Sequence, residues 1–418
     1  MTTSPPRPQE VTGGLPPLLP GPRRLLKHPR LMHYNRLAAL VLLANATFAW
    51  AFWPLDAATL GHAALANLAL AVVVRQQYVI NLLFRLATSA PTTWPLRIRW
   101  TLGKVYHFGG LHVGGALAGT AWFLAATITA SDGPTQAVGW TLIALLALVV
   151  ATALPPFRSR RHDDFEKIHR FGGWGALALF WTHTLLSPSG PWEVGVLAVV
   201  TFSVALPWLR LRKVDVHLER PSSHVVLARF DHGETPFAGS STAISRSPLR
   251  EWHSFANVPT PGESGFRLTI SRAGDWTGSF IDDLPRQVWV KGITTAGVAN
   301  IEVLFTKVIY VATGSGIGPC LPHLLAAQVP SRLVWATRDP RATYGDALVD
   351  EILAVQPDAR IWDTSRHGKP DMVRLAHEAY RDFGAEAVIC ISNKKLTWQV
   401  VHGLERRGIP AYGAIWDS

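Results

Sequence analysis

The amino-acid sequence predicts a multi-domain membrane protein: a six-helix transmembrane bundle, then a soluble half with an antiparallel β-barrel and an α/β parallel-sheet domain. Two observations carry this prediction. The long apolar runs of the 418-residue chain are confined to residues 33–211, and each is near the ~20 residues that cross a hydrocarbon core. After residue 213 the pattern changes to short alternating strands, and then to a repeat of strand, glycine turn and helix.

The six apolar runs are connected by loops of alternating charge. Lys and Arg follow the second, fourth and sixth runs, whereas the other three loops, around Asp56, Asp132 and Glu193, contain neither. Because cytoplasmic loops are enriched in Lys and Arg, both termini and the soluble half are predicted on the cytoplasmic side of the cell membrane. The runs are 33–53, 58–84, 103–129, 136–155, 165–186 and 192–211.

The composition argues against several classes of protein. The formal net charge is +11, but Lys and Arg gather at the ends of apolar runs, which favours membrane topology over nucleic-acid binding. The two cysteines, Cys320 and Cys390, are too few for a disulfide framework or a Cys-rich metal centre, and they suit a reducing cytoplasm. Residues 1–32 are predicted to be a flexible, basic, proline-rich tail without the apolar core of a signal peptide.

The soluble half divides at about residue 303. Segments such as HVVLARF, FRLTISR and QVWVKGI alternate in the manner of β-strands and predict the barrel over residues 214–303. Over residues 304–418 apolar strands alternate with helices, which predicts a parallel sheet. With the bundle at 33–213, three folded domains are expected.

One glycine-rich turn carries a chemical prediction. The stretch VIYVATGSGIGP (308–319) is an apolar strand that runs into a tight turn and then a helix. Gly314, Gly316 and Gly318 let the backbone approach a pyrophosphate, and the helix N-terminus offers N–H donors. The spacing departs from G-x-G-x-x-G, so an ordinary glycine-rich turn is the alternative interpretation.

Three motifs resemble a superfamily of membrane flavoproteins. ATGSGIGP (312–319) resembles the nicotinamide-dinucleotide loop of the ferredoxin–NADP reductase superfamily. RAGDWTGSF (272–280) and EWHSFANVP (251–259) resemble the G-x-W-T and H-P-F-T-I-S motifs of the flavin domains in NADPH oxidases and ferric reductases. The resemblance covers nearly all of residues 33–418, and it is closest to the fungal integral-membrane flavoproteins of the Tmp type.

This resemblance implies a site for FAD, a site for NAD(P)H and two catalytic positions. Cys390 would lie near the nicotinamide, and Trp416 would cover the flavin ring. The implied FAD residues are His253, Ser254, Phe255, Gly274, Trp276 and Thr277. The implied NAD(P)H residues are Thr313, Gly314, Ser315, Gly316, Ile317, Gly318 and Arg338, of which Arg338 would meet the adenosine phosphate.

The sequence departs from the family at several of these positions. Ser254 and Ala256 replace the proline and the threonine of H-P-F-T. The family motif C-G-P reads Cys390-Ile391-Ser392, and the G-P-Y/F-G turn reads Gly292-Ile293-Thr294. Both lose glycines that permit close backbone approach. The sequence therefore leaves undecided whether hydride transfer from NAD(P)H is fast. It also leaves undecided whether the nucleotide is NAD or NADP.

Histidines in the third and fifth runs raise the question of haem, because family members bind two b-type haems between these spans. His107 and His169 each begin an H-x-x-G motif at the same predicted depth, which implies one inner haem b; hydrated interfacial rings are the alternative. The outer pair fails, since the position fourteen residues after His107 is not histidine, and His62 with His183 is the remaining combination. His112 lies ~140° around a helix from His107 and is not predicted as a substitute.

The expected function is electron transfer by a ferric reductase-like, integral-membrane flavin oxidoreductase. Electrons from cytoplasmic NAD(P)H would pass through FAD to an inner-leaflet haem or to an unidentified acceptor reached from the bilayer. Two alternatives stay open. One is a haem-free flavoprotein acting on a lipophilic substrate or quinone, and the other is a degenerate relative that senses redox state or scaffolds a partner.

Overall fold

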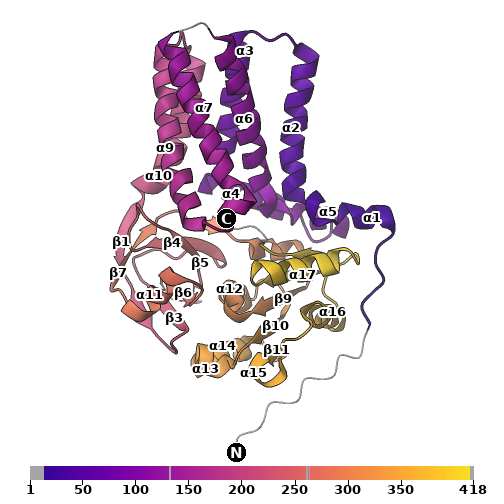
Figure 1. The fold of residues 1–418 in the computed structure, drawn as a ribbon. Coiled ribbons are helices and arrows are strands. Elements are labelled where there is room, and N and C mark those ends of the chain that lie inside the picture. The colour runs from indigo at the N-terminus through magenta and orange to yellow at the C-terminus, as the bar shows by residue number, and fades with distance from the viewer. Residues whose placement is uncertain (1–13, 131–132, 260–261, 263, 415–418) are drawn as a thin grey trace, which may run out of the picture.

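In the computed structural model, a helical bundle stands on a soluble half that has two lobes (Figure 1). The structure describes residues 14–414, except residues 131–132, 260–261 and 263. Antiparallel strands form one lobe, and a parallel sheet with its helices forms the other (Figure 1). Both lobes lie at the same end of the bundle, so groups from all three regions meet there.

Six long helices form the bundle, and small residues let them approach closely. A Cβ atom on Gly115 of α6 would lie 2.7 Å from the Asn67 carbonyl oxygen of α3, and one on Gly119 would lie 2.6 Å from Leu68. Such close backbone approach is typical of helices that associate within membranes. The long helices are α2 (His33–Phe52), α3 (Ala57–Val73), α6 (Gly109–Thr129), α7 (Pro134–Ala153), α9 (His162–Leu186) and α10 (Pro191–Leu209). The short ones are α1 (Gly21–Leu26), η1 (Pro29–Leu31), α4 (Gln77–Thr88), α5 (Leu96–Leu102), η2 (Val105–Phe108) and α8 (Pro155–Arg158).

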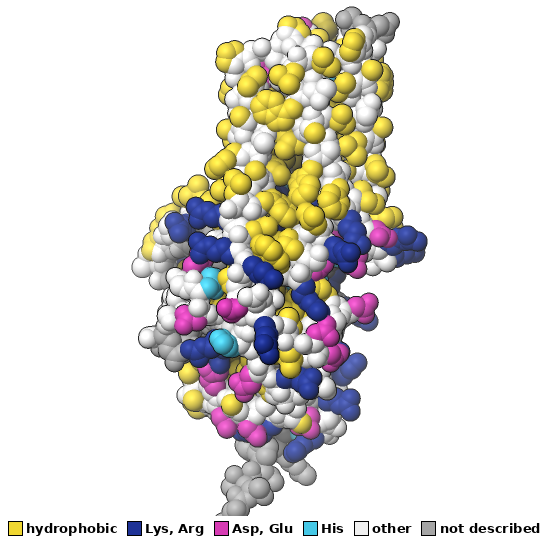
Figure 2. All heavy atoms as spheres, turned by 90° about the vertical axis from the view of Figure 1, so that its left-hand side faces the viewer, with side chains coloured by type: hydrophobic (Ala, Val, Ile, Leu, Met, Phe, Trp, Pro, Cys, Tyr) yellow, Lys and Arg dark blue, Asp and Glu magenta, His cyan; other side chains and the backbone are white. Residues whose placement is uncertain are grey.

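The bundle has the apolar surface that a membrane requires. On the face in Figure 2, hydrophobic side chains cover the bundle, and Lys and Arg appear where the soluble half begins. Within the described residues, four helices are long and apolar enough to cross a membrane, and the bent pair α3 and α4 would make a fifth. The four are His33–Phe52, Val105–Thr129, Pro134–Ala153 and Pro191–Leu209. Helix α9 does not qualify, since acids and bases fill its first turns, and the six-span prediction is not confirmed.

The second predicted span, 58–84, bends instead of crossing as one helix. α3 and α4 meet at an angle of 78°. The side chain of Gln76 accepts a hydrogen bond from the first turn of α4 and caps that helix. At the base of the bundle, Asn81 on α4 donates to the Thr294 carbonyl and accepts from the Ala296 N–H, both at 2.9 Å. α4 therefore joins the bundle to the antiparallel lobe.

The antiparallel lobe consists of two sheets that share one core. One has the order β1-β7-β4-β5, with β8 paired to β4, and the other has the order β2-β3-β6. Their inner faces meet around Phe230, Ile244 and Phe280, and an isolated bridge joins Val258 to Arg267. The predicted β-barrel is not confirmed, because the strands form two separate sheets joined only by this bridge among the described residues. The elements are β1 (Leu211–Asp215), β2 (His217–Glu219), β3 (Val225–Phe230), β4 (Ser240–Ser245), β5 (His253–Ala256), β6 (Phe266–Ser271), α11 (Asp275–Asp283), β7 (Gln287–Lys291), β8 (Thr295–Ala296) and η3 (Val298–Leu304).

The other lobe contains the five-stranded parallel sheet that the sequence predicts, in the order β11-β10-β9-β12-β13. Because the order reverses between β9 and β12, a crevice opens at the carboxyl ends of these strands. β9 has helices over both faces, which explains its continuous apolar sequence. The elements are β9 (Val308–Thr313), η4 (Gly314–Gly316), α12 (Ile317–Ala326), β10 (Ser331–Thr337), α13 (Pro340–Tyr344), α14 (Asp346–Val355), β11 (Arg360–Asp363), α15 (Thr364–His367), α16 (Met372–Phe383), β12 (Ala387–Ile391), α17 (Lys394–Glu405) and β13 (Ala411–Tyr412).

Buried polar contacts tie the base of the bundle to the parallel-sheet lobe. Arg99 on α5 lies 2.7 Å from Glu386, and Lys104 Nζ lies 2.5 Å from Glu405 on α17. The indole N–H of Trp100 also donates to Glu405, at 2.9 Å. The N-terminal segment runs along the end of α17, with hydrogen bonds that join residues 16, 19 and 27 to residues 407, 406 and 402.

Candidate functional site

The glycine loop after β9 lies in the crevice of the parallel sheet, and two of its glycines are required by geometry. Gly314 has φ +48°, and its carbonyl oxygen accepts a 3.0 Å hydrogen bond from the Trp335 indole. A Cβ atom on Gly316 would lie 2.0 Å from the carbonyl oxygen of Ile391, at the end of β12. The loops after β9 and β12 thus touch, and α12 begins directly behind them with its N-terminus in the crevice.

The end of β12 differs from the family motif in a way the structure explains. Ser392 stands where the motif has proline, and its hydroxyl hydrogen-bonds the Thr313 hydroxyl across the crevice. Since Ile391 carries a side chain where the motif has glycine, the close approach of the two loops depends on Gly316 alone. Ser392 was not among the predicted site residues. Its position directly after a strand that flanks the glycine loop was the available signal.

Of the two predicted catalytic residues, the structure describes only Cys390. Cys390 is fully buried, and it packs in the cluster between β9, α16 and α17. Burial raises the pKa of the Cys390 thiol to about 12, so the thiol stays protonated at neutral pH. This environment suits a packing residue, and the catalytic role of Cys390 stays a prediction. Trp416 lies outside the described residues.

The predicted flavin residues gather where β5 meets the N-terminus of α11. The rings of His253 and Trp276 stack with their centroids 4.0 Å apart, and Phe255 lies on the same side at 6.3 Å from Trp276. The hydroxyl of Thr277 accepts hydrogen bonds from the N–H groups of Ala273 and Gly274, at 2.9 and 3.1 Å. Ser254 is exposed on the edge strand. β5, α11 and the turn that leads from β6 into α11 therefore form one continuous surface.

The two sets of predicted residues face each other across the lobes. α12 packs against β5 and β6, and a Cβ atom on Gly318 would lie 3.4 Å from Thr269 of β6. At this junction Thr269 Oγ1 is buried without a hydrogen-bond partner among the described residues, and on β5 the same holds for His253 Nε2. Burial also lowers the pKa of His253, so its ring is neutral at neutral pH. Buried polar atoms without partners are expected where a polar ligand belongs, so the residues present fit a dinucleotide between the lobes.

Two arginines, Arg338 and Arg341, follow the C-terminal end of β10. Arg338 is exposed there, and its guanidinium has no ion pair within the part of the chain that the structure describes. Arg341, three residues later, pairs with Asp346 at 2.8 Å and with Asp350 at 2.7 Å. Of the two arginines, Arg338 is the one available to a phosphate.

The histidines of the bundle do not form the predicted pairs. His107 stacks on His33 with centroids 6.1 Å apart, while His169 contacts His112 at 6.0 Å. His107 lies in the 3₁₀ turn η2, before α6 begins, so the α-helical phase that separates it from His112 does not apply, and the His107–His169 haem pair stays a prediction. The ring neighbour of His169 is thus His112, which the sequence analysis did not predict as a haem ligand. Among the described residues, no group of three or more His, Cys, Asp or Glu could hold a metal ion.

The two outer histidines, His62 and His183, also contact different residues. His62 Nε2 lies 2.6 Å from the carboxylate of Glu193, and His183 packs edge-on against Phe123 at 5.3 Å. The prediction of a His62–His183 pair is therefore not supported by the geometry.

Comparison with known proteins relates the chain to fungal reductases. The family model of the C-terminal domain of adenylate-forming reductase 03009 matches residues 298–418. Adenylate-forming reductase 03009 of Coprinopsis cinerea is 43% identical over 423 residues, and adenylate-forming reductase 06235 of the same fungus is 42% identical over 424 residues. Each alignment covers 94% of this chain and 41% of the relative, so the chain spans about two fifths of the length of these relatives.

Solved structures give weaker similarity. A ferredoxin NADP⁺ reductase from Neisseria gonorrhoeae with bound FAD and NADP has a TM-score of 0.41 and 12% identity, covering 49% of this chain and 98% of that chain. A flavohemoglobin from Malassezia yamatoensis with bound FAD and heme has a TM-score of 0.43 and 13% identity, covering 91% of this chain and 99% of that chain. Ferredoxin–NADP reductases thus recur at low similarity, and the resemblance to NADPH oxidases, ferric reductases and the Tmp type stays a prediction.

Proposed function

We propose that the chain is an NAD(P)H-dependent flavin oxidoreductase whose two nucleotides meet between the lobes. The observation that carries this proposal is the glycine loop at the strand-order reversal, whose helix α12 packs against β5, the strand that carries His253 of the His253–Trp276 stack. A loop in this position is the usual dinucleotide site of an open parallel sheet. The second, stacked surface within reach of it supplies a place for a second nucleotide.

The residues have separable roles in this proposal. The backbone of Gly314–Gly318 and the α12 N-terminus hold the pyrophosphate of NAD(P)H, and Arg338 meets the adenosine phosphate. His253, Trp276 and the α11 N-terminus hold FAD. When bound, FAD supplies the redox chemistry, by accepting a hydride and passing electrons onward. The protein orients the two nucleotides and excludes water from between them, and the hydroxyls of Thr313 and Ser392 line the entry to the nicotinamide side.

The proposal places the bundle in the cell membrane with both lobes on the cytoplasmic side. Four or five helices of sufficient length and the Lys- and Arg-rich loops support it. The electron acceptor is then one that is reached at the base of the bundle. Haem is left out of the proposal, because His107 and His169 have different partners.

A second candidate concerns the acceptor, and the sequence relatives favour it. Their printed names describe proteins that form adenylates and act as reductases, and this chain matches them along 94% of its own length. In this candidate the chain is the reducing part of such a system, and the acceptor is an activated carboxyl group delivered by an adenylate-forming partner or domain.

An absorption spectrum of the purified full chain in detergent tests the proposal. We expect a flavin spectrum that bleaches when NADPH is added without oxygen. Purified protein without flavin, even after incubation with FAD, would overturn the proposal. A Soret band that shifts on reduction would restore the haem hypothesis, and reduction of an acyl adenylate would select the second candidate.

A further inference from the structure

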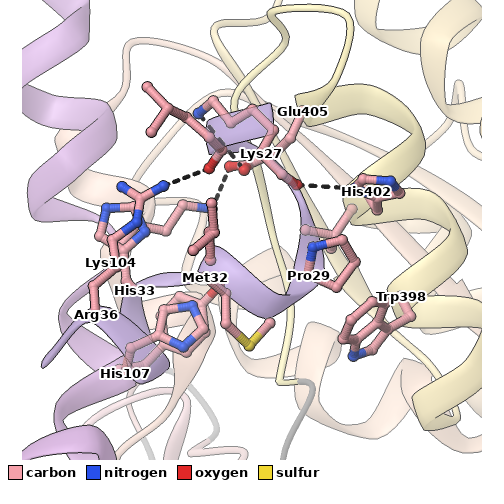
Figure 3. Close-up of a pocket in the computed structure, with 14 residues that line it drawn as sticks. Lys27, Pro29, Met32, His33, Arg36, Lys104, His107, Trp398, His402 and Glu405 are labelled. Atoms are coloured by element: carbon pink, nitrogen blue, oxygen red, sulfur yellow. Dashed lines mark hydrogen bonds and ion pairs between the residues drawn. The ribbon is translucent and has the colours of Figure 1, made fainter. Parts of the chain in front are cut away.

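A basic pocket lies between the N-terminal segment, the foot of α2 and α17, and no residue of the proposed flavin or NAD(P)H site lines it (Figure 3). Its lining combines cationic side chains, histidines and apolar groups, with Glu405 as the single carboxylate of the lining. The basic lining residues are Lys27, His33, Arg36, Lys104, His107 and His402.

The charges in this pocket do not balance. Glu405 has one oxygen 2.5 Å from Lys104 Nζ and the other 3.6 Å from Lys27 Nζ. Burial raises the pKa of Glu405, but the two ammonium groups outweigh this effect and hold it below its ordinary value, so the carboxylate is ionised. Arg36 is a third cation, and it contacts the Leu26 carbonyl oxygen. Burial lowers the pKa of Lys27 and of Lys104, and Glu405 counteracts this effect at both. With both lysines protonated, three cations against one carboxylate leave an excess of positive charge in a half-buried place, which favours an anion.

His107 provides a second, independent observation. The residue is only 3% exposed, and its Nδ1 is buried without a hydrogen-bond partner among the described residues. In Figure 3, His107 lies beside His33, Lys104 and Arg36, so the unpaired atom belongs to the same wall as the cations. A phosphate group satisfies this atom in either tautomer, since its oxygens accept a hydrogen bond and its hydroxyl donates one.

Apolar side chains also line the pocket. Leu26 and Leu31 are 55% and 39% exposed, and Met32 lines the pocket between them and α2. The enclosed space is about 40 Å³, which is the room of about three water molecules and fits a head group without its chains. α2 itself is one of the helices long enough to cross a membrane. The occupant should therefore join an anionic group to an apolar body at the membrane surface.

We propose that this pocket binds the phosphate group of an anionic lipid, with its acyl chains over Leu26 and Leu31 at the foot of α2. The phosphate contacts Arg36, His107 and the Lys27–Lys104 pair, and it links α2 to α17 of the parallel-sheet lobe. The proposal does not depend on the flavin chemistry. It predicts that lipid composition changes how firmly the bundle and this lobe are held together.

Calorimetric titration of the full chain in detergent tests the site. The probes are dihexanoyl phosphatidic acid, inorganic phosphate and dihexanoyl phosphatidylcholine. We expect phosphatidic acid to bind at least about tenfold more tightly than the other two, because only it combines an exposed phosphate monoester with chains. Equal binding of inorganic phosphate would keep the phosphate site and overturn the lipid source. No binding of either phosphate would overturn the site.

Variants separate the pocket from general basic charge. Arg36→Gln should weaken phosphatidic acid binding about fivefold through the loss of charge-assisted contacts, and His107→Phe should weaken it while keeping the ring stack. Arg30→Gln is the matched control, since Arg30 is exposed on the neighbouring turn and does not line the pocket. Thermal unfolding checks that each variant is folded. If Arg30→Gln weakens binding as much as Arg36→Gln does, the pocket assignment is wrong.

Discussion

The two turns that carry predicted nucleotide-binding residues, one in each lobe, are built by different means. The turn at Gly314–Gly316 is shaped by backbone contact, since Gly316 touches the Ile391 carbonyl and Gly314 has a positive φ. The turn at Gly274–Thr277 is shaped by a side chain, whose hydroxyl accepts from two backbone N–H groups. The first turn leaves its backbone N–H groups available to a ligand. In the second turn, two backbone N–H groups already donate to the Thr277 hydroxyl. A phosphate is therefore expected to bind more firmly at the first turn.

The largest effect is expected from Gly316→Ala. The added Cβ would lie 2.0 Å from a carbonyl oxygen of the backbone, which cannot yield as a side chain can. We expect a loss of about 3 kcal/mol in the free energy of unfolding, together with loss of NADPH-dependent flavin reduction. Denaturant unfolding and stopped-flow absorption measure the two effects.

Gly274→Ala is the matched control in the turn of the antiparallel lobe. Its Cβ would meet nothing within 4 Å, and its φ of 179° is extended backbone that any residue adopts. We expect a change within about 0.5 kcal/mol. Equal destabilisation by the two alanines would contradict the distinction between the turns.

A smaller and more selective effect is expected from Arg338→Gln. If Arg338 meets the adenosine phosphate, its loss should raise KM for NADPH about tenfold, or about 1.4 kcal/mol, and leave KM for NADH unchanged. Arg341→Gln is the comparison, because the guanidinium of Arg341 is already held by Asp346 and Asp350. Steady-state kinetics with both nucleotides decides the matter, and a parallel rise of both KM values would remove Arg338 from the phosphate site.

The smallest effect is expected from Thr277→Ala in the flavin turn. The substitution removes the acceptor of two N–H groups. It should lower the free energy of unfolding by about 1 kcal/mol and reduce the amount of FAD that the purified protein retains. Thr277→Ser keeps the hydroxyl and should keep both. Flavin content after gel filtration, set beside thermal unfolding, measures the result; an unchanged alanine variant would mean that water replaces the hydroxyl.

The parallel-sheet lobe was predictable because its signals are local. An apolar strand, a glycine turn and a helix occur in one continuous stretch, and the structure has β9, η4 and α12 at those residues. The pairing of His253 with Trp276 was reached only by resemblance, since 23 positions separate the two residues and no local pattern connects them.

The bundle was less predictable because hydropathy records how apolar a segment is, and not where it bends. The run 58–84 contains the cap at Gln76 that starts α4 in a new direction, and the apolar residues on both sides conceal it. The phase argument about the histidines meets a related limit, and the haem pair itself stays a prediction. His107 lies in the 3₁₀ turn η2 and His112 in α6, so a uniform rotation of 100° per residue does not relate them.

The position of Glu405 has a consequence for dissecting the molecule. Every side-chain partner that the described structure gives to this carboxylate, on Lys27, Trp100 and Lys104, comes from the first quarter of the chain. A fragment that starts at β1 would keep both lobes and lose all three partners at once. Such a fragment would expose the end of α17 and leave the Glu405 carboxylate without its partners, so the two lobes are not expected to fold as an independent module. Truncation experiments will therefore need the N-terminal segment supplied together with the lobes.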